Sequence, residues 1–351
     1  MNNEFNEILK QDHSLNSILQ QAKQQRSINI GGMENDFKSV FLSFLAHNIK
    51  SNIIYITSTD FSAKKMLSSF KNNSNILLYP SAGLYSGISA AHDRITDYER
   101  ILTLCLLKEN KKNLIITSAE ALSFPISENI YDYILKIKLS DKFDISLLSL
   151  DLINLGYERC EVTESKGQFS IRGSIIDIFP INFENPVRID FFGDEIESIK
   201  YFDADKQTSL YTIDNAKIYP CKEIIYTKEE ENKILTLAEN EIEKRLNTVK
   251  KLSENNSFKE EVTDNLNQLR SSVLARPFYL SAFTNKSVNF LSYTNDSIIV
   301  IDSMNTIKQA YSDHIKNYTL LYSQLYEKGK AFACEIDALF KFERLLEIIQ
   351  Q

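Results

Sequence analysis

The sequence predicts an α/β protein with a parallel-sheet domain, an inserted small antiparallel β-rich domain, and a helical part that completes the first domain. In the first third of the 351 residues, short apolar runs alternate with helical stretches, which is typical of a parallel sheet covered on both faces. From about residue 157, apolar and polar residues alternate one by one, which indicates antiparallel strands. The predicted boundaries are 1–150, 151–218 and 219–351.

Each element of the first domain is predicted from its apolar periodicity. The helix expected at 36–49 has an apolar face made of Phe37, Val40, Phe41, Phe44 and Leu45. Further helices are expected at 61–71 and 96–110. Buried strands are expected at 28–32, 52–59, 75–80 and 113–119.

The second and third segments have different patterns. Residues 167–180 and 185–202 alternate apolar and polar side chains, and Gly193-Asp194 separates two such runs, as in a hairpin. Residues 228–252 carry Glu and Lys at helical spacing, which is typical of a solvated helix face. Residues 297–303 predict one more buried strand, followed by two terminal helices.

Composition and charge exclude several classes of protein. Apolar residues make up 43% of the chain and charged residues 25%, as in a soluble globular protein. The net charge of -7 argues against a body that binds nucleic acid over a whole face. No apolar run has the roughly 20 residues of a membrane span, so we expect a cytoplasmic protein without a membrane partner. Four widely spaced cysteines predict buried reduced thiols, with neither zinc nor disulfides.

Residues 31–39 nearly match a phosphate loop of the form Gly-x-x-x-x-Gly-Lys-Ser/Thr. Gly32, Lys38 and Ser39 are in register, but Phe37 replaces the second glycine. Glycines in this loop let backbone N–H groups curl around a phosphate, and a side chain at this point obstructs that approach. The loop also contains acidic residues, Glu34 and Asp36.

We therefore interpret the first domain as P-loop-like but degenerate. The candidate strand for a magnesium-binding acid, 113–119, is followed by Glu120 and has no Asp-Glu pair. The sequence predicts no catalytic residue, no metal and no cofactor for this chain. A modified but working ATP site is the alternative.

Residues 167–207 resemble the small β-rich domain shared by the bacterial excision-repair protein UvrB and the transcription-repair coupling factors. Many fixed positions in about forty residues make this resemblance more specific than a short motif. The matching positions are Gly167, Phe169, Arg172, Gly173, Asp177, Ile178, Phe179, Pro180, Pro186, Arg188, Asp190, Phe191, Phe192, Asp194, Glu195, Ile196, Phe202 and Asp203. A weaker resemblance covers essentially the whole chain.

Two observations favour the coupling factors over UvrB. UvrB requires an intact phosphate loop, whereas this one is broken. UvrB also carries a tyrosine-rich hairpin for damaged DNA, whereas the corresponding stretch here has only Tyr79 and Tyr85. A divergent UvrB-like protein that binds ATP and damaged DNA is the alternative, and a DNA-binding module is a second one.

The alternation places Arg188, Asp190 and Phe192 on the polar face of one strand and Val187, Ile189 and Phe191 on its apolar face. In the preceding run, Phe169, Ile171 and Ile175 are expected on one face and Ser170, Arg172 and Ser174 on the other. An exposed phenylalanine beside an arginine indicates a protein interface. Alternatively, Arg188 pairs with Asp190, and Phe192 packs under a loop.

The resemblance implies a specific partner. In both families this domain binds the damage sensor UvrA, and residues matching Arg172, Arg188 and Phe192 make the contact. The family often has Gln-Arg where this chain has Gln207-Thr208, a departure that affects the same surface. The family's full-length proteins are ATP-dependent DNA translocases that also bind RNA polymerase and duplex DNA, through regions absent here.

Overall fold

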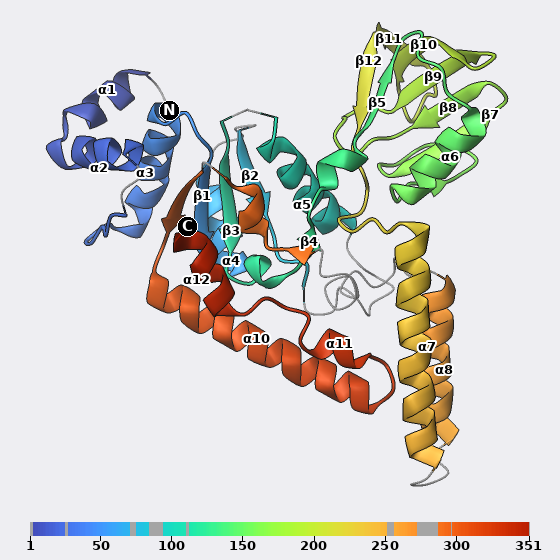
Figure 1. Ribbon diagram of the computed structural model, residues 1–351. Coiled ribbons are helices and arrows are strands. Elements are labelled where there is room, and N and C mark those ends of the chain that lie inside the picture. The colour runs from blue at the N-terminus through green and yellow to red at the C-terminus, as the bar shows by residue number, and fades with distance from the viewer. Residues whose placement is uncertain are drawn as a thin grey trace.

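The computed structural model describes residues 3–24, 27–70, 75–83, 94–109, 112–250, 256–271, 287–295 and 297–350. Figure 1 shows an α/β body that contains both ends of the chain, a β-rich unit, and a pair of long helices. The mixed α/β fold class with one parallel sheet and one antiparallel β-rich sheet is confirmed. No helix in these described ranges is long and apolar enough to span a membrane.

The body is built on a parallel sheet with the strand order β14-β1-β3-β2. Alternate residues of β1 face opposite cores: Ile54 and Ile56 join one core, and Ile53 and Tyr55 join the other. Such burial on both faces explains the continuous apolar runs in the sequence. The strands are β1 (Ile53–Thr57), β2 (Ile76–Tyr79), β3 (Leu114–Ser118) and β14 (Ile298–Ile301).

The late strand β14 pairs in parallel with β1, with Val300 opposite Tyr55. The C-terminal segment therefore completes the first sheet, as predicted. The remaining helices of the body are α1 (Asn3–Gln11), α2 (His13–Lys23), α3 (Asn35–Asn48), α4 (Asp60–Ser68), α5 (Arg94–Leu107), α10 (Met304–Glu327), α11 (Ala333–Ile336) and α12 (Phe342–Gln350). A two-stranded ribbon joins β4 (Ile126–Ser127) to β13 (Ser287–Val288).

The strand predicted at 28–32 is absent, because residues 27–34 form no strand and no helix. The expectation for Phe37 is also wrong: its side chain is 37% exposed, whereas Phe41 and Phe44 are buried. The sequence did not predict helices α1 and α2. Helix α2 supplies Leu15 and Leu19 to the core beside α3, and Leu9 of α1 packs against it. The apolar face of α3 thus begins one turn later than predicted.

The β-rich unit contains a six-stranded sheet with the order β11-β10-β9-β8-β7-β6. Only β6 and β7 are parallel; the other neighbours are antiparallel, as predicted. The strands are β6 (Glu158–Arg159), β7 (Gln168–Arg172), β8 (Ile175–Ile178), β9 (Val187–Phe192), β10 (Glu195–Phe202) and β11 (Ser209–Ile213). Helix α6 (Ile145–Asn154) contributes Leu148 and Leu152 to the same core as the inner face of this sheet.

A second two-stranded ribbon shows where the chain enters and leaves the β-rich unit. Strand β5 (Leu135–Lys138) pairs with β12 (Asn215–Ile218), although the predicted boundary at residue 151 assigns them to different segments. The ribbon that belongs with the β-rich unit therefore begins at residue 135. The domain boundaries at residues 151 and 218 stay a prediction. Beyond the ribbon, α7 (Lys228–Lys250) and α8 (Asn256–Ser271) lie side by side (Figure 1).

Only two of the four cysteines are buried as expected. Cys105 and Cys221 lie in the core, whereas Cys160 and Cys334 are partly exposed. Burial raises the pKa of both buried thiols to about 12, so they stay protonated and unreactive.

Helix α5 joins the body to the β-rich unit. The buried Arg100 donates to both carboxylate oxygens of Glu223, at 2.7 and 3.1 Å, just after the unit ends. Burial by itself would lower the pKa of Arg100, but the Glu223 carboxylate raises it above its usual value. On the same helix, the Tyr98 hydroxyl donates to the carbonyl of Lys166 at 3.3 Å. These contacts fix the unit against the body.

Substituting Gly167 tests this junction. Its φ is +82°, and an added Cβ would lie 2.1 Å from the Tyr98 hydroxyl oxygen. We expect Gly167→Ala to lower the free energy of unfolding by about 2–4 kcal/mol, because backbone strain and overpacking add. The matched control, Gly32→Ala, has a similar φ of +75° and open space around the new Cβ, so only about 1 kcal/mol is expected. Urea denaturation measures both, and equal losses would contradict the close packing.

Candidate functional site

The degenerate phosphate loop does not have the geometry of a nucleotide site. A phosphate loop follows a sheet strand and leads into a helix, so that its N–H groups converge on an anion. Here the described residues just before Gly32, 27–31, form no strand, and α3 already begins at Asn35, three residues before Lys38. Phe37 therefore lies in the first turn of the helix rather than in a loop.

The loop's two polar side chains already have partners within the chain. Lys38 Nζ lies 2.5 Å from Oδ1 of Asp302, which follows β14. The Ser39 hydroxyl donates weakly to the carbonyl of Asp36 at 3.4 Å. The lysine that would contact a phosphate is thus neutralised by a carboxylate.

Further carboxylates lie at the same end of the sheet. Asp60 Oδ2 accepts from the backbone N–H of Ser81 at 2.8 Å, and Oδ1 accepts from the Ser118 hydroxyl. Burial and then the Asp60 charge raise the pKa of Glu120. Ligands of open α/β sheets bind at the carboxyl ends of the strands, and here that end presents anions that would repel phosphate.

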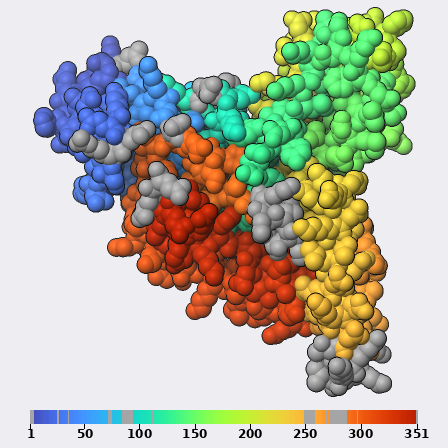
Figure 2. Space-filling model, viewed as in Figure 1, coloured from blue at the N-terminus to red at the C-terminus, as the bar shows by residue number. Residues whose placement is uncertain are grey.

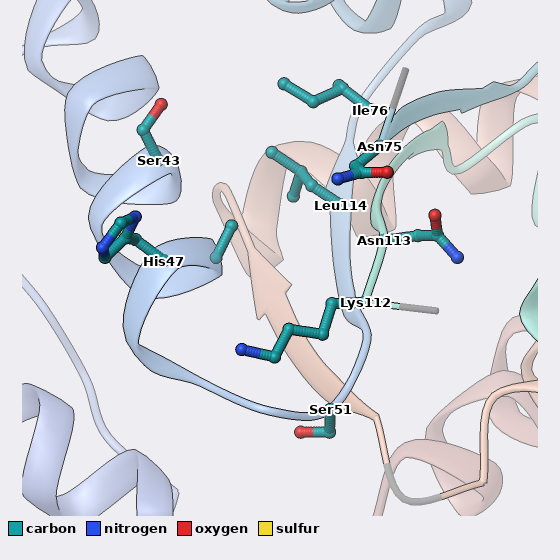
Figure 3. A pocket seen from close by; sticks show the side chains of 9 residues that line it. Ser43, His47, Ser51, Asn75, Ile76, Lys112, Asn113 and Leu114 are labelled. Atoms are coloured by element: carbon teal, nitrogen blue, oxygen red, sulfur yellow. The ribbon is translucent and has the colours of Figure 1, made fainter. Parts of the chain in front are cut away.

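A shallow cavity of about 190 Å³ lies at the opposite, amino end of the sheet. Figure 3 shows His47 from α3 and Lys112, which lies two residues before β3, on its walls. Both side chains are exposed, and the cavity adjoins the C-terminal end of α3, where the helix dipole disfavours anions. It therefore does not replace the phosphate site.

The outer face of the antiparallel sheet brings two of the predicted site residues together. The strand register places Asp177 of β8 directly opposite Arg188 of β9. Arg188 donates from Nε to Oδ1 at 2.7 Å and from Nη2 to Oδ2 at 2.9 Å. Arg172, at the end of β7, donates from Nη2 to the same Oδ2 at 2.5 Å. One carboxylate therefore binds both arginines.

The three side chains differ in exposure. The Asp177 side chain is 1% exposed, whereas those of Arg172 and Arg188 are 48% and 16% exposed. Arg188 also lies over the ring of Phe202, with Cζ 4.6 Å from its centroid. The Asp177 side chain raises the pKa of Arg188 through its hydrogen bond. The arginines cover the carboxylate, and Arg172 is the more exposed of the two.

Phe192 is 80% exposed at the end of β9, so the alternative in which it packs under a loop is wrong. It shares the face of Arg188 and lies four residues along the strand, about 13 Å away. The alternative pairing is also wrong, because Arg188 pairs with Asp177. Asp190 instead accepts from the Ser198 hydroxyl at 2.6 Å and from Lys200 Nζ at 2.9 Å.

One predicted face assignment needs correction. Ile175 lies directly opposite Arg172 and Asp190, so it shares their face and not the face of Ile171. The prediction continued the one-by-one alternation from β7 through Gly173-Ser174 into β8. The chain reverses at these two residues, so the residues of β8 point to the opposite faces from those predicted. The same turn moves Asp177 onto the arginine face, which is why the sequence did not indicate Asp177 as a site residue.

The β-rich unit stands away from the α/β body in the space-filling view (Figure 2). Near its outer face, Gln207 donates through Nε2 to the carbonyl of Ala204 at 2.7 Å and has a φ of +56°. Thr208 accepts from Asp203 N–H through its carbonyl at 2.9 Å. The Gln207-Thr208 departure thus lies in the turn before β11.

Tyr85, from the stretch compared with the UvrB hairpin, lies outside the described residues.

Comparisons with known proteins show which proteins the β-rich unit and the whole chain resemble. Residues 135–224 match the family model described as UvrB interaction domain. The transcription-repair-coupling factor of Bacillus subtilis (strain 168) is 27% identical over 325 residues, which cover 90% of this chain and 28% of that protein. Its counterpart in Staphylococcus aureus (strain USA300) is 25% identical over 353 residues, covering 97% of this chain and 30% of that protein.

The chain spans less than one third of the length of these relatives. The family match includes the whole six-stranded sheet and both strands of the β5–β12 ribbon. The resemblance predicted from the sequence is thereby confirmed. Over most of its length the chain is similar to the transcription-repair-coupling factors, and residues 135–224 match the UvrB interaction domain.

Proposed function

We propose that this chain recruits UvrA through the outer face of its β-rich unit. The observation that carries the proposal is the arrangement of Arg172 and Arg188 over Asp177, with the exposed Phe192 on the same face of β9 as Arg188. We call these three residues, Arg172, Arg188 and Phe192, the docking face. The family model for residues 135–224 supports a role in the UvrA–UvrB repair pathway.

The chemistry of the docking face suits a protein partner. Arginine and aromatic side chains dominate the energy of protein interfaces. Within the described part of the chain, Nη1 of Arg172 and of Arg188 has no protein partner. These donors match carboxylate or carbonyl groups, while the Phe192 ring requires an apolar depression on UvrA.

The rest of the chain serves as a rigid, non-catalytic scaffold in this proposal. The α/β body around the parallel sheet holds the β-rich unit, and the outer face of that unit presents the docking face. Lys38 is held by Asp302, which argues against the alternative of a UvrB-like ATP- and damaged-DNA-binding protein. The relatives are more than three times as long, so ATP-driven translocation and binding of RNA polymerase and duplex DNA belong to regions outside this chain.

Removing both arginines tests the docking face. We expect the chain to bind the cognate UvrA in calorimetry, and Arg172→Ala/Arg188→Ala to weaken binding by about 30-fold or more, as for interface hot spots. The control is Arg270→Ala/Arg344→Ala, which removes two exposed arginines paired with Glu239 and Glu347 and leaves affinity unchanged. Undiminished binding by the first variant would contradict the assignment of the arginines to the binding site. If the intact chain did not bind UvrA, the proposed function itself would be wrong.

Phe192 has a well-matched control elsewhere in the chain. Phe61 on α4 is 78% exposed, nearly the same as Phe192, but it lies on the α/β body. We expect Phe192→Ala to weaken UvrA binding by about 10-fold or more, because an aromatic anchor is lost. Phe61→Ala loses an equal ring without any change in affinity. Equal effects of the two substitutions in the same binding assay would contradict a docking face on the sheet.

The proposed loss of nucleotide binding is tested directly. Titration of the chain with Mg-ATP is expected to release no binding heat at millimolar nucleotide, because a carboxylate already binds Lys38 and carboxylates surround the sheet end. Lys38→Ala, measured alongside, is expected to behave identically. Tight Mg-ATP binding that disappears in Lys38→Ala would show that the loop still holds phosphate.

A further inference from the structure

We infer that Asp177 is a positioning residue of the docking face: its buried carboxylate fixes the directions of the Arg172 and Arg188 side chains before UvrA arrives. This inference rests on the proposed function and adds a residue that makes no contact with the partner. It also predicts that UvrA meets arginines that are largely ordered in the free protein.

The strand register places the carboxylate between the two arginines. Asp177 lies opposite Ser170 of β7 on one side and opposite Arg188 of β9 on the other. Both carboxylate oxygens accept hydrogen bonds, Oδ1 from Arg188 alone and Oδ2 from both arginines. No rotation of the Asp177 side chain is needed to reach either partner, because the pleat aims all three side chains to the same face.

Burial limits Asp177 to an indirect role. With 1% of its side chain exposed beneath the arginines, its oxygens are not accessible to another protein. Arg188 is held most firmly, by two parallel hydrogen bonds and by the Phe202 ring. Arg172 has a single hydrogen bond and greater exposure. Asp177 therefore orients Arg188 rigidly and tethers Arg172.

Arginine side chains that are already ordered in the free protein raise its affinity for UvrA. A long side chain that is immobilised on binding loses rotamer freedom, which weakens an interface by about 2- to 13-fold for each such residue. Side chains already held by Asp177 avoid most of this loss. Removing the carboxylate is thus expected to weaken UvrA binding by about 10-fold, although both positive charges remain.

The test compares two isosteric substitutions on one sheet face. We expect Asp177→Asn to weaken UvrA binding about 10-fold, since an amide cannot accept three charged hydrogen bonds. The control is Asp190→Asn, two residues beyond Arg188 on β9, where the carboxylate binds Ser198 and Lys200 instead. That variant is expected to stay within about threefold of the unaltered chain. Calorimetry measures affinity, and thermal melting confirms that both variants fold.

A double-mutant cycle separates positioning from a structural role. If Asp177 acts through the arginines, the effect of Asp177→Asn shrinks to about threefold or less in an Arg188→Ala background. A structural role would give the same factor in both backgrounds. That result, or full affinity of a folded Asp177→Asn, overturns the inference and leaves the proposed function standing.

A second measurement needs no substitution and no partner. Side-chain ¹⁵N relaxation in the free, unaltered chain is expected to show a rigid Arg188 Nε–H group, more ordered than that of the exposed Arg270. Free rotation of Arg188 would overturn the inference even if Asp177→Asn fails to fold. Should the intact chain not bind UvrA, the proposed function fails, and this measurement still decides whether Arg188 is ordered in the free protein.

Discussion

The carboxylate of Asp177 is almost fully buried on the outer face of a sheet, and a buried charge costs several kcal/mol unless it is paired. The two arginines that compensate it come from the neighbouring strands β7 and β9. A register slip by one residue on either side would leave the charge unpaired. Strand pairing and the position of both guanidinium groups are therefore specified by one interaction, which is the feature that gives this sheet a defined surface chemistry.

The same pairing of a carboxylate with a cation has the opposite consequence in the α/β body. Asp302 is itself partly exposed and binds the single ammonium group of Lys38. The positive charge of Lys38 is thereby neutralised and would attract a phosphate only weakly. Asp177 lies beneath its partners, and a guanidinium has five donors, so each arginine keeps N–H groups that Asp177 does not bind. The depth of the carboxylate and the number of donors on its partner thus distinguish the degenerate phosphate loop from the proposed docking face.

The sequence predicted the parallel sheet, the change to antiparallel strands, and the faces of β9, because continuous and alternating apolar runs report burial directly. It failed at 28–32, where the apolar run does not pair, and at Phe37, because α1 and α2 supply the core there instead. It also missed Asp177, since the turn at Gly173-Ser174 resets the alternation and no local pattern reveals which strands become neighbours. The docking residues themselves were indicated by the resemblance rather than by periodicity.

The central claim is that UvrA binds the outer face of the β-rich sheet, and hydrogen–deuterium exchange of the intact chain with and without UvrA tests it most directly. The turns at 172–175 and 192–195 flank the docking face and have backbone groups outside the ladder, so their amides exchange readily in the free chain. The account predicts that UvrA slows exchange at both turns and leaves residues 31–39 unaffected. Slowed exchange at 31–39 with unchanged turns would contradict it.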